Sequence, residues 1–360
     1  MRVKKILFRF LSVLCLGISV LSVTSCGEKN PDGGNLSSGS LDDYYTEGLE
    51  FTLVEDGESY KVCIGTAMDS HIVIPSSYEG KPVTTIGEYA FANEFLTKIT
   101  IPDSVTTIGN YAFYNCENLI KLSIGNNIEI IGEKAFAGCK LKNVTMPANV
   151  IPFISKSNLN IAIITGGDLI PDSAFSKCTA LSSVVINTKQ IGNNAFIDCN
   201  SLRNVVLCDS VEIIGEKAFY QCENLASLEL PEGITCIEPY TFYGCESLTS
   251  ITIPSSVENI GNYAFCGCSS LASVTIPKGI TCIESNTFSG CTSLTSVIIP
   301  KSVKKINGFS FNNCNSLETV YYTGTEEQWN SISIEKLSWS SNDGTYSILT
   351  NSTIVYNYKG

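Results

Sequence analysis

A 23-residue pattern of apolar positions repeats along most of the chain, and residues 273–295 (SVTIPKGITCIESNTFSGCTSLT) are a clear copy of it. Within this copy, apolar side chains stand at fixed offsets from Phe288, and the residues between them are mostly polar. A fixed apolar template with a period of about 20–30 residues is typical of a solenoid, in which each repeat forms one turn. The pattern therefore predicts a repeat protein. The apolar positions are Val274, Ile276, Ile280, Ile283, Phe288, Cys291 and Leu294.

The phenylalanine of the template marks the successive repeats, at steps of 17–23 residues. The 17-residue step, which passes through Phe153, is the irregular one. Because Leu159, Ile164 and Ile170 still fit the template there, we interpret this step as a shortened repeat and not as a domain break. The series is Phe91, Phe113, Phe136, Phe153, Phe175, Phe196, Phe219, Phe242, Phe265, Phe288 and Phe311.

Each repeat divides into two short apolar segments and a turn. Residues 273–276 alternate polar and apolar, which predicts a short strand with Val274 and Ile276 facing inward. Pro277 ends this strand because proline cannot donate to a strand ladder. Ile280 and Ile283 form a second inward pair, and the phenylalanine begins a compact turn. We expect a right-handed, β-rich solenoid of about eleven repeats, whose turns are stable only when stacked.

The two ends of the solenoid are expected to be covered. Residues 49–82 are predicted to form an N-terminal cap that contains a hairpin around Asp56-Gly57, and residues 83–320 the solenoid itself. Residues 321–360 are predicted to form a C-terminal cap. Its Thr325-Glu326-Glu327-Gln328 run is a capping-box pattern that predicts a short helix beginning at Thr325. We expect Trp329 to lie over the last repeat and a final strand to follow at residues 353–356.

The N-terminus resembles a bacterial lipoprotein signal. Residues 1–25 combine a basic start with an apolar run of about 14 residues, which is short for a membrane span and typical of a signal peptide. Small residues precede Cys26, as in the site where lipoproteins are cleaved and acylated. We predict lipidation of Cys26, with ordinary secretion as the alternative. Residues 26–48 are rich in Gly, Ser, Asn and Asp and are predicted to form a flexible tether.

The charge balance restricts the partners. The chain carries 23 basic and 35 acidic residues, a formal net charge of −12. Such an acidic surface repels phosphate backbones and anionic membranes, so we do not expect nucleic-acid binding. Hydrophobic residues make up 44% of the sequence and charged residues 16%, which predicts a large core and not a disordered chain.

Nine of the sixteen cysteines follow a template phenylalanine by three residues. This regularity indicates a packing position, where a thiol acts as a small hydrophobic group. Stacked turns also bring these Cα atoms within disulfide range, so disulfides remain the alternative, and metal binding has the least support. The nine are Cys116, Cys139, Cys178, Cys199, Cys222, Cys245, Cys268, Cys291 and Cys314.

Little in the sequence points to catalysis. His71 is the only histidine, and neither a glycine-rich phosphate loop nor a cluster of metal-ligating residues is present. We therefore predict no catalytic residues, no metal and no cofactor. A secreted glycan-active hydrolase, which would need a pair of carboxylates, is the alternative with the least support.

The repeated motif I-G-x-x-A-F-x-x-C-x-x-L, seen at residues 108–119 and 214–225, resembles the BspA-like family of bacterial leucine-rich repeats. The resemblance covers about residues 49–360. It implies a cell-surface or secreted protein, at the outer membrane if lipid-anchored, that takes part in adhesion by binding host proteins, glycans or other cells. A structural or spacer protein of the cell surface without a specific ligand is the alternative.

An extended strand surface is the part of such a fold wide enough for a protein or polysaccharide partner. The strand positions expected to face outward are mostly small or β-branched. Among them we select Thr252, Thr275 and Ile298 as candidate ligand-binding residues, and we expect binding to be broad and shallow. The outward positions are Ser123, Thr145, Val185, Val206, Glu229, Thr252, Thr275 and Ile298.

Overall fold

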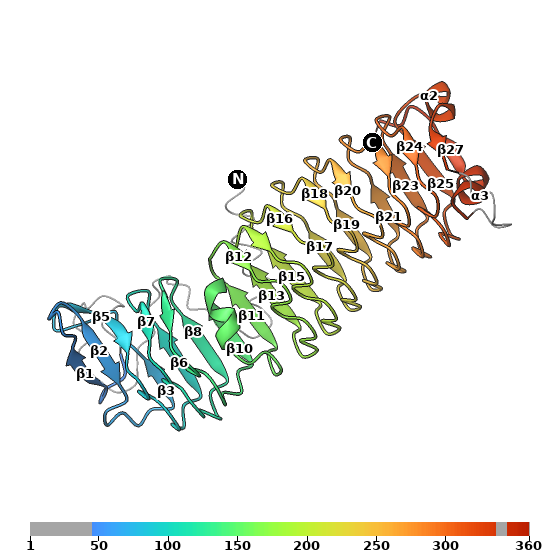
Figure 1. The fold of residues 1–360 in the computed structure, drawn as a ribbon. Coiled ribbons are helices and arrows are strands. Elements are labelled where there is room, and N and C mark those ends of the chain that lie inside the picture. Colours follow the sequence, from blue (N-terminus) through green and yellow to red (C-terminus); the bar gives the residue numbers. More distant parts are fainter. Residues whose placement is uncertain (1–44, 336–343, 360) are drawn as a thin grey trace, which may run out of the picture. The chain divides into compact units, whose positions relative to one another are not determined.

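The computed structural model describes residues 45–335 and 344–359. The predicted signal segment, Cys26 and most of the predicted tether lie outside the described residues. The described residues form a stack of turns, and most turns contribute one longer and one shorter strand that lie on two sides of the stack (Figure 1). The predicted β-solenoid of about eleven turns of about 23 residues is therefore confirmed.

The longer strands, here called the long-strand row, pair in parallel within three hydrogen-bonded groups, β3 to β15, β17 with β19, and β21 to β27. Parallel pairing follows from the solenoid, because each turn places its strand beside the same strand of the previous turn. The row consists of β3 (His71–Val73), β6 (Lys98–Ile101), β8 (Lys121–Ile124), β10 (Asn143–Met146), β11 (Ile161–Ile164), β13 (Ser183–Ile186), β15 (Asn204–Leu207), β17 (Ser227–Glu229), β19 (Ser250–Thr252), β21 (Ser273–Thr275), β23 (Ser296–Ile299), β25 (Thr319–Tyr322) and β27 (Thr353–Val355).

The other strands, most of them two residues long, form a second row, the short-strand row, in four hydrogen-bonded groups: β1 to β9, β12 to β16, β18 with β20, and β22 to β26. The row consists of β1 (Glu50–Leu53), β2 (Tyr60–Cys63), β5 (Lys81–Ile86), β7 (Thr107–Ile108), β9 (Ile130–Ile131), β12 (Leu169–Ile170), β14 (Gln190–Ile191), β16 (Ile213–Ile214), β18 (Cys236–Ile237), β20 (Asn259–Ile260), β22 (Cys282–Ile283), β24 (Lys305–Ile306) and β26 (Ser333–Ile334). A further short strand, β4 (Ser77–Tyr78), pairs with β5 in antiparallel orientation.

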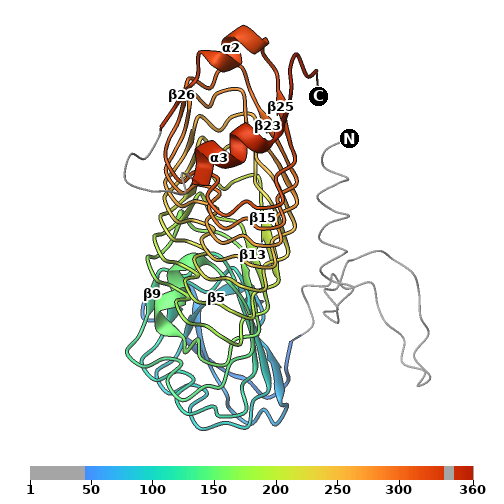
Figure 2. The same ribbon diagram turned by 90° about the vertical axis from the view of Figure 1, so that its right-hand side faces the viewer.

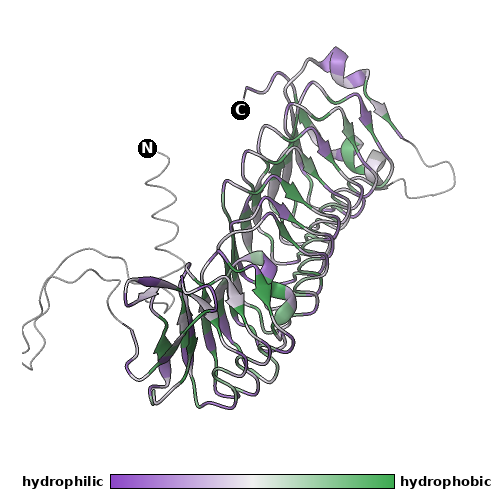
Figure 3. Cartoon of the chain, turned by 60° about the vertical axis from the view of Figure 1, so that its left-hand side comes forward, coloured by the Kyte–Doolittle hydropathy of each residue, from purple (hydrophilic) through white to green (hydrophobic). Residues whose placement is uncertain are grey.

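The template phenylalanines stack on one another inside the solenoid. Successive rings lie 5.1–5.8 Å apart between centroids and within 14° of parallel. Each is essentially inaccessible to solvent, and hydrophobic residues concentrate along the strands (Figure 3). Such stacking adds about 0.5–1.5 kcal/mol per aromatic pair to the burial of the rings. The stacked rings are those of Phe91, Phe113 and Phe136, and of Phe175, Phe196, Phe219, Phe242, Phe265, Phe288 and Phe311.

The turn around each stacked phenylalanine has a left-handed residue on both sides. The residues two before and two after all ten rings have positive φ, for example Tyr240 (59°) and Gly244 (69°) around Phe242. Glycine occupies only four of these twenty positions; elsewhere Asn, Lys, Tyr and other residues adopt a backbone region that costs most side chains free energy. The tight turn that holds the phenylalanine inward therefore needs this geometry in every repeat.

The prediction for Phe153 is wrong, although the shortened repeat itself is confirmed. β10 and β11 pair in parallel, so no domain break occurs. Between them lies the 3-10 helix η2 (Ala148–Phe153), and the Phe153 side chain is 45% exposed. Within this helix Ala148, Val150 and Ile151 are buried, and Ile154, which follows it, is buried as well. The phenylalanine turn is absent from this repeat, and the stack is interrupted there.

The N-terminal hairpin forms as predicted. β1 and β2 are antiparallel, with Phe51 opposite Val62 and Leu53 opposite Tyr60, and Gly57 in the connection has a φ of 72°. β2 also pairs in parallel with β5, and β3 with β6. The segment 49–82 thus supplies the first strand to both rows of the stack.

The predicted capping box is present at the other end, where α2 (Glu326–Asn330) and α3 (Gly344–Asn351) lie (Figure 2). The Thr325 side chain accepts a hydrogen bond from the Gln328 backbone, and the Gln328 side chain accepts one from the Thr325 backbone. Trp329 is 8% exposed and packs edge-on against the buried ring of Tyr322 at 5.2 Å. The predicted final strand is β27, which pairs with β25.

Candidate functional site

The outward residues of the long-strand row lie in a line along the stack, although the strand ladder is interrupted on both sides of the β17–β19 pair. Thr275 lies opposite Ile298, and Ile298 lies opposite Tyr321. Thr252 belongs to the neighbouring pair of strands, where it lies opposite Glu229. The structure therefore brings Thr275 and Ile298 together, whereas no strand ladder joins Thr252 to them.

Exposure differs along this line. Thr252 and Thr275 are exposed, and Ile298 is half-buried. Val185, which we expected to face solvent, is only 6% exposed, so that expectation is wrong. Its strand partners on the same face are Ile163 and Val206, and three adjacent branched side chains leave little room for water between them. The line is therefore more closed around Val185 than at Thr252 and Thr275.

Aromatic side chains extend the line beyond Ile298. Tyr321 is half-buried, and its ring lies 4.5 Å from that of Tyr358. Val355, opposite Tyr321 on β27, is 37% exposed. We did not predict this surface from the sequence, because we assigned residues 321–360 to a cap. The repeat period could have found it, since Tyr321 stands 23 residues after Ile298.

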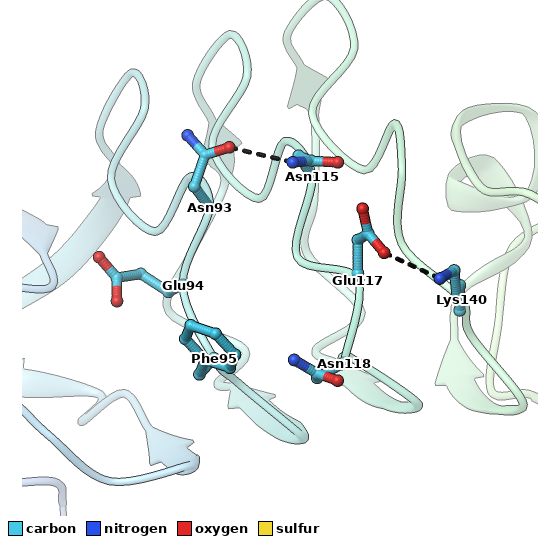
Figure 4. Close-up of a pocket in the computed structure, with 7 residues that line it drawn as sticks. All are labelled: Asn93, Glu94, Phe95, Asn115, Glu117, Asn118 and Lys140. Carbon is cyan, nitrogen blue, oxygen red and sulfur yellow. Dashed lines mark hydrogen bonds and ion pairs between the residues drawn. The ribbon is translucent and has the colours of Figure 1, made fainter.

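A shallow pocket of about 280 Å³ lies near the other end, against the turns that follow the first phenylalanines of the stack (Figure 4). The Asn115 side-chain amide donates to the Asn93 side chain at 3.2 Å. Lys140 pairs with Glu117 at 2.9 Å, and this ion pair lowers the pKa of Glu117. Figure 4 shows Glu94 pointing away from that pair. The pocket offers amide and charged groups for hydrogen bonding together with one apolar surface, Phe95, which is 81% exposed.

The buried cysteines also have a hydrogen-bonding role, which their spacing in the sequence did not indicate. Cys245 donates its thiol hydrogen to the backbone oxygen of Phe219, in the previous turn, at 3.3 Å. Seven more cysteines of the series make the same bond to the phenylalanine of the previous turn, at 2.9–3.3 Å. All fourteen cysteines among the described residues are free, including the nine that we interpreted as packing positions. The seven are Cys116, Cys139, Cys199, Cys222, Cys268, Cys291 and Cys314.

These thiols are held in their protonated form. Burial raises the pKa of Cys139, Cys199 and Cys245 to about 12, from an ordinary value of 9.0. A thiol is a nucleophile or metal ligand only as the thiolate. These three side chains are therefore structural groups that bridge adjacent turns, not reactive ones.

Other titratable groups are scattered over the surface. His71 lies at the start of the long-strand row, where partial burial and the charge of Lys98 lower its pKa. Within residues 45–335 and 344–359, no group of three His, Cys, Asp or Glu side chains is close enough to hold a metal ion. None of the helices in the described part of the chain is long and apolar enough to span a membrane.

Parallel strands, stacked phenylalanines and a repeat of about 23 residues define a β-solenoid of the leucine-rich-repeat class. The profile of the family described as BspA type Leucine rich repeat region (6 copies) matches residues 84–188, 153–226, 168–261 and 235–348. The chain therefore belongs to the BspA-type leucine-rich repeat family. No curated protein matches the chain.

Solved structures of bacterial leucine-rich repeat proteins are similar to the chain. A leucine rich cell surface protein from Faecalibacterium prausnitzii is 27% identical, with 84% of this chain and 100% of that chain covered and a TM-score of 0.29. A leucine-rich repeat protein from Bacteroides ovatus is 23% identical, with 87% and 99% covered and a TM-score of 0.39. The leucine rich repeat protein of T. pallidum is 28% identical, with 62% and 88% covered and a TM-score of 0.34. With superpositions this loose, the family assignment rests on the repeat sequence.

Proposed function

We propose that this protein is an adhesion or ligand-binding module of the bacterial cell surface. Its partners would be host proteins, glycans or the surface of another cell, and its action would be binding without catalysis. The observation that carries this proposal is the outward line of the long-strand row, where Thr275, Ile298 and Tyr321 lie side by side on paired strands.

The side chains of this line suit a partner with an extended contact surface. Thr252 and Thr275 present hydroxyl groups, which hydrogen-bond to sugars or to polypeptide backbones. Ile298 and the paired rings of Tyr321 and Tyr358 add an apolar end, and tyrosine is enriched where proteins bind other proteins. Adjacent turns stand about 4.8 Å apart, so contacts repeat along the row and each makes a small contribution.

The experiment compares two sets of substitutions in binding to immobilised matrix proteins, glycans and whole cells. The first variant, Thr252→Lys/Thr275→Lys/Ile298→Lys, adds bulk and charge to the strand face. We expect its binding to the best partner to fall by about tenfold or more, in the range found when interface centres are disrupted. Its melting temperature should remain close to that of the unchanged protein, because these side chains do not belong to the core.

The matched control, Ser293→Lys/Asn315→Lys/Ser316→Lys, places the same charges on exposed turn residues. Ser289 is unsuitable for this control because its side chain is only 8% exposed. We expect the control to bind nearly as well as the unchanged protein. Loss of binding in the control, with binding intact in the strand variant, would show that the ligand lies on the turns.

We also propose that the protein is anchored through a lipid on Cys26 after removal of residues 1–25. The support is the basic start, the apolar run and the small residues before Cys26. In a bacterial host, the protein should take up labelled fatty acid and sediment with membranes, whereas a Cys26→Ala variant should not be labelled. Equal labelling of the variant would exclude Cys26 as the anchor site and leave secretion as the alternative.

A further inference from the structure

Four tyrosines from three consecutive turns form one aromatic cluster, called here the tyrosine cluster: Tyr220, Tyr240, Tyr243 and Tyr263. The rings of Tyr220 and Tyr243 stack at 4.7 Å and 5°. Those of Tyr240 and Tyr263 stack at 4.8 Å and 4°, and Tyr240 also contacts Tyr243 at 6.0 Å. All four side chains are half-buried.

The cluster lies on the turns around the stacked phenylalanines, away from the outward line of the long-strand row. Tyr240 and Tyr263 stand two residues before Phe242 and Phe265, at left-handed backbone positions with φ of 59° and 60°. Asn194 and Asn286 occupy the same position in other turns, and asparagine adopts this conformation at lower cost. Two neighbouring turns thus carry a tyrosine at a position where other turns carry asparagine, which adopts the left-handed conformation at a lower free-energy cost.

The edges of the four rings are available to a partner. Because the rings stack on each other, their faces are largely covered and their hydroxyl edges remain. None of the four hydroxyls hydrogen-bonds to another residue in the described part of the chain. Proximity to the other tyrosines and to Cys266 adds to partial burial in raising the pKa of Tyr243, so its hydroxyl stays protonated and able to donate.

The part of the sequence that carries the cluster is strongly one-sided in charge. Residues 204–277 contain nine carboxylates and a single basic residue, Lys217. This stretch accounts for a net −8 of the chain's formal −12. Such a concentration of charge attracts cations and repels anions within about 10 Å at moderate salt. The carboxylates belong to Asp209, Glu212, Glu216, Glu223, Glu229, Glu232, Glu238, Glu246 and Glu258.

The single base shows how a cation is held here. The Lys217 ammonium lies over the Tyr240 ring, 5.0 Å from its centroid, and forms an ion pair with Glu216 at 2.7 Å. A cation above a tyrosine ring and beside a carboxylate is favourable electrostatically. Lys217 occupies the left-handed position of its own turn, so it extends the column of Tyr240 and Tyr263 by one repeat.

From this arrangement we propose that the tyrosine cluster binds an arginine-rich segment of a partner protein. The planar guanidinium group presents five N–H donors that can hydrogen-bond to phenol hydroxyls and carboxylates at once, which an ammonium does less well. The acidic stretch attracts the segment, and the four phenols hold it together with the Glu216 carboxylate that pairs with Lys217. This site is separate from the strand face and does not depend on the function proposed above.

The test uses labelled octa-arginine and octa-lysine peptides and a neutral cello-oligosaccharide, with binding to the full-length protein measured by fluorescence anisotropy or calorimetry. The variant Tyr220→Ser/Tyr240→Asn/Tyr243→Ser/Tyr263→Asn replaces each tyrosine by a residue that other turns carry at the same position. We expect octa-arginine to bind more tightly than octa-lysine, and the variant to lose about tenfold or more of its affinity for octa-arginine.

Two further variants test the roles of the internal cation and of the acidic stretch separately. Lys217→Asn removes the competing internal cation and should raise the affinity for octa-arginine by about threefold or more. Tyr89→Asn/Tyr111→Asn changes another stacked pair, with rings 5.0 Å apart, outside the acidic stretch, and should alter the affinity by less than about threefold. Unchanged octa-arginine binding in the four-tyrosine variant, or equal losses in both tyrosine variants, would overturn the proposal. So would oligosaccharide binding that depends on the four tyrosines while peptide binding does not.

Discussion

The buried thiols predict that the protein loses stability in alkali. A thiol whose pKa is higher in the folded than in the unfolded chain binds its proton more tightly when folded. Its contribution to the free energy of unfolding is complete below the unfolded pKa, near 9.0, and is lost as the pH rises from there towards the folded pKa. For Cys139, Cys199 and Cys245 the folded pKa is about 12, so the relevant window is pH 9 to 12.

The size of the effect follows from these values. At about pH 10 an unfolded thiol is mostly ionised, whereas a folded thiol with a pKa of about 12 is still protonated. Each such thiol therefore lowers the free energy of unfolding by about 1 kcal/mol at this pH. The three thiols together should lower the free energy of unfolding by roughly 3–4 kcal/mol between about pH 8 and pH 10. The other buried cysteines, whose pKa values are also raised, add to this loss of stability in the same direction.

The assay is urea denaturation followed by circular dichroism at both pH values, with a reductant present. The variant Cys139→Ala/Cys199→Ala/Cys245→Ala is less stable at neutral pH, because it loses three thiol-to-carbonyl hydrogen bonds and leaves small cavities. Its further loss between the two pH values should nevertheless be smaller by roughly 3–4 kcal/mol. Tyrosines and lysines also titrate in this range but are the same in both proteins. Equal alkaline losses would refute the reasoning.

Two further predictions concern the core and the C-terminal end. Phe242→Ala should lower the free energy of unfolding by about 3–5 kcal/mol, because its ring is stacked between two others. Phe153→Ala should lower it by less than about 1 kcal/mol, because the Phe153 ring is half exposed. Equal losses of stability for the two variants in chemical denaturation would contradict the assignment of the stack. Trp329→Ala should cost about 3–5 kcal/mol if the proposed C-terminal cap is stabilising, and a change below about 0.5 kcal/mol would place the indole at the surface.

The sequence by itself determined the period, the inward positions and the class of fold. A phenylalanine that recurs at 21–23-residue steps, with apolar residues at fixed offsets, leaves one arrangement that buries all of them. The capping box at Thr325 was also readable, because it depends on contacts within four residues. These features are local or strictly periodic, and such features are the ones that a sequence pattern records.

Other features depended on contacts between turns. Phe153 was assigned to the phenylalanine series across an irregular 17-residue step, yet a 3-10 helix leaves its ring 45% exposed and buries Val150 and Ile151 instead. The thiol of Cys245 finds its acceptor 26 residues away, on Phe219. The sequence pattern gave the apolar environment of that cysteine but not its hydrogen bond.

The candidate binding surfaces were the least predictable part of the protein. Tyr220, Tyr243 and Tyr263 are separated by 20–23 residues in sequence but lie in contact through Tyr240, because stacking places equivalent positions of adjacent turns about 5 Å apart. Tyr321 joins Ile298 for the same reason. Repeat spacing fixes which positions meet, while only the stacked turns decide which side chains remain exposed there, since exposure depends on the neighbours above and below.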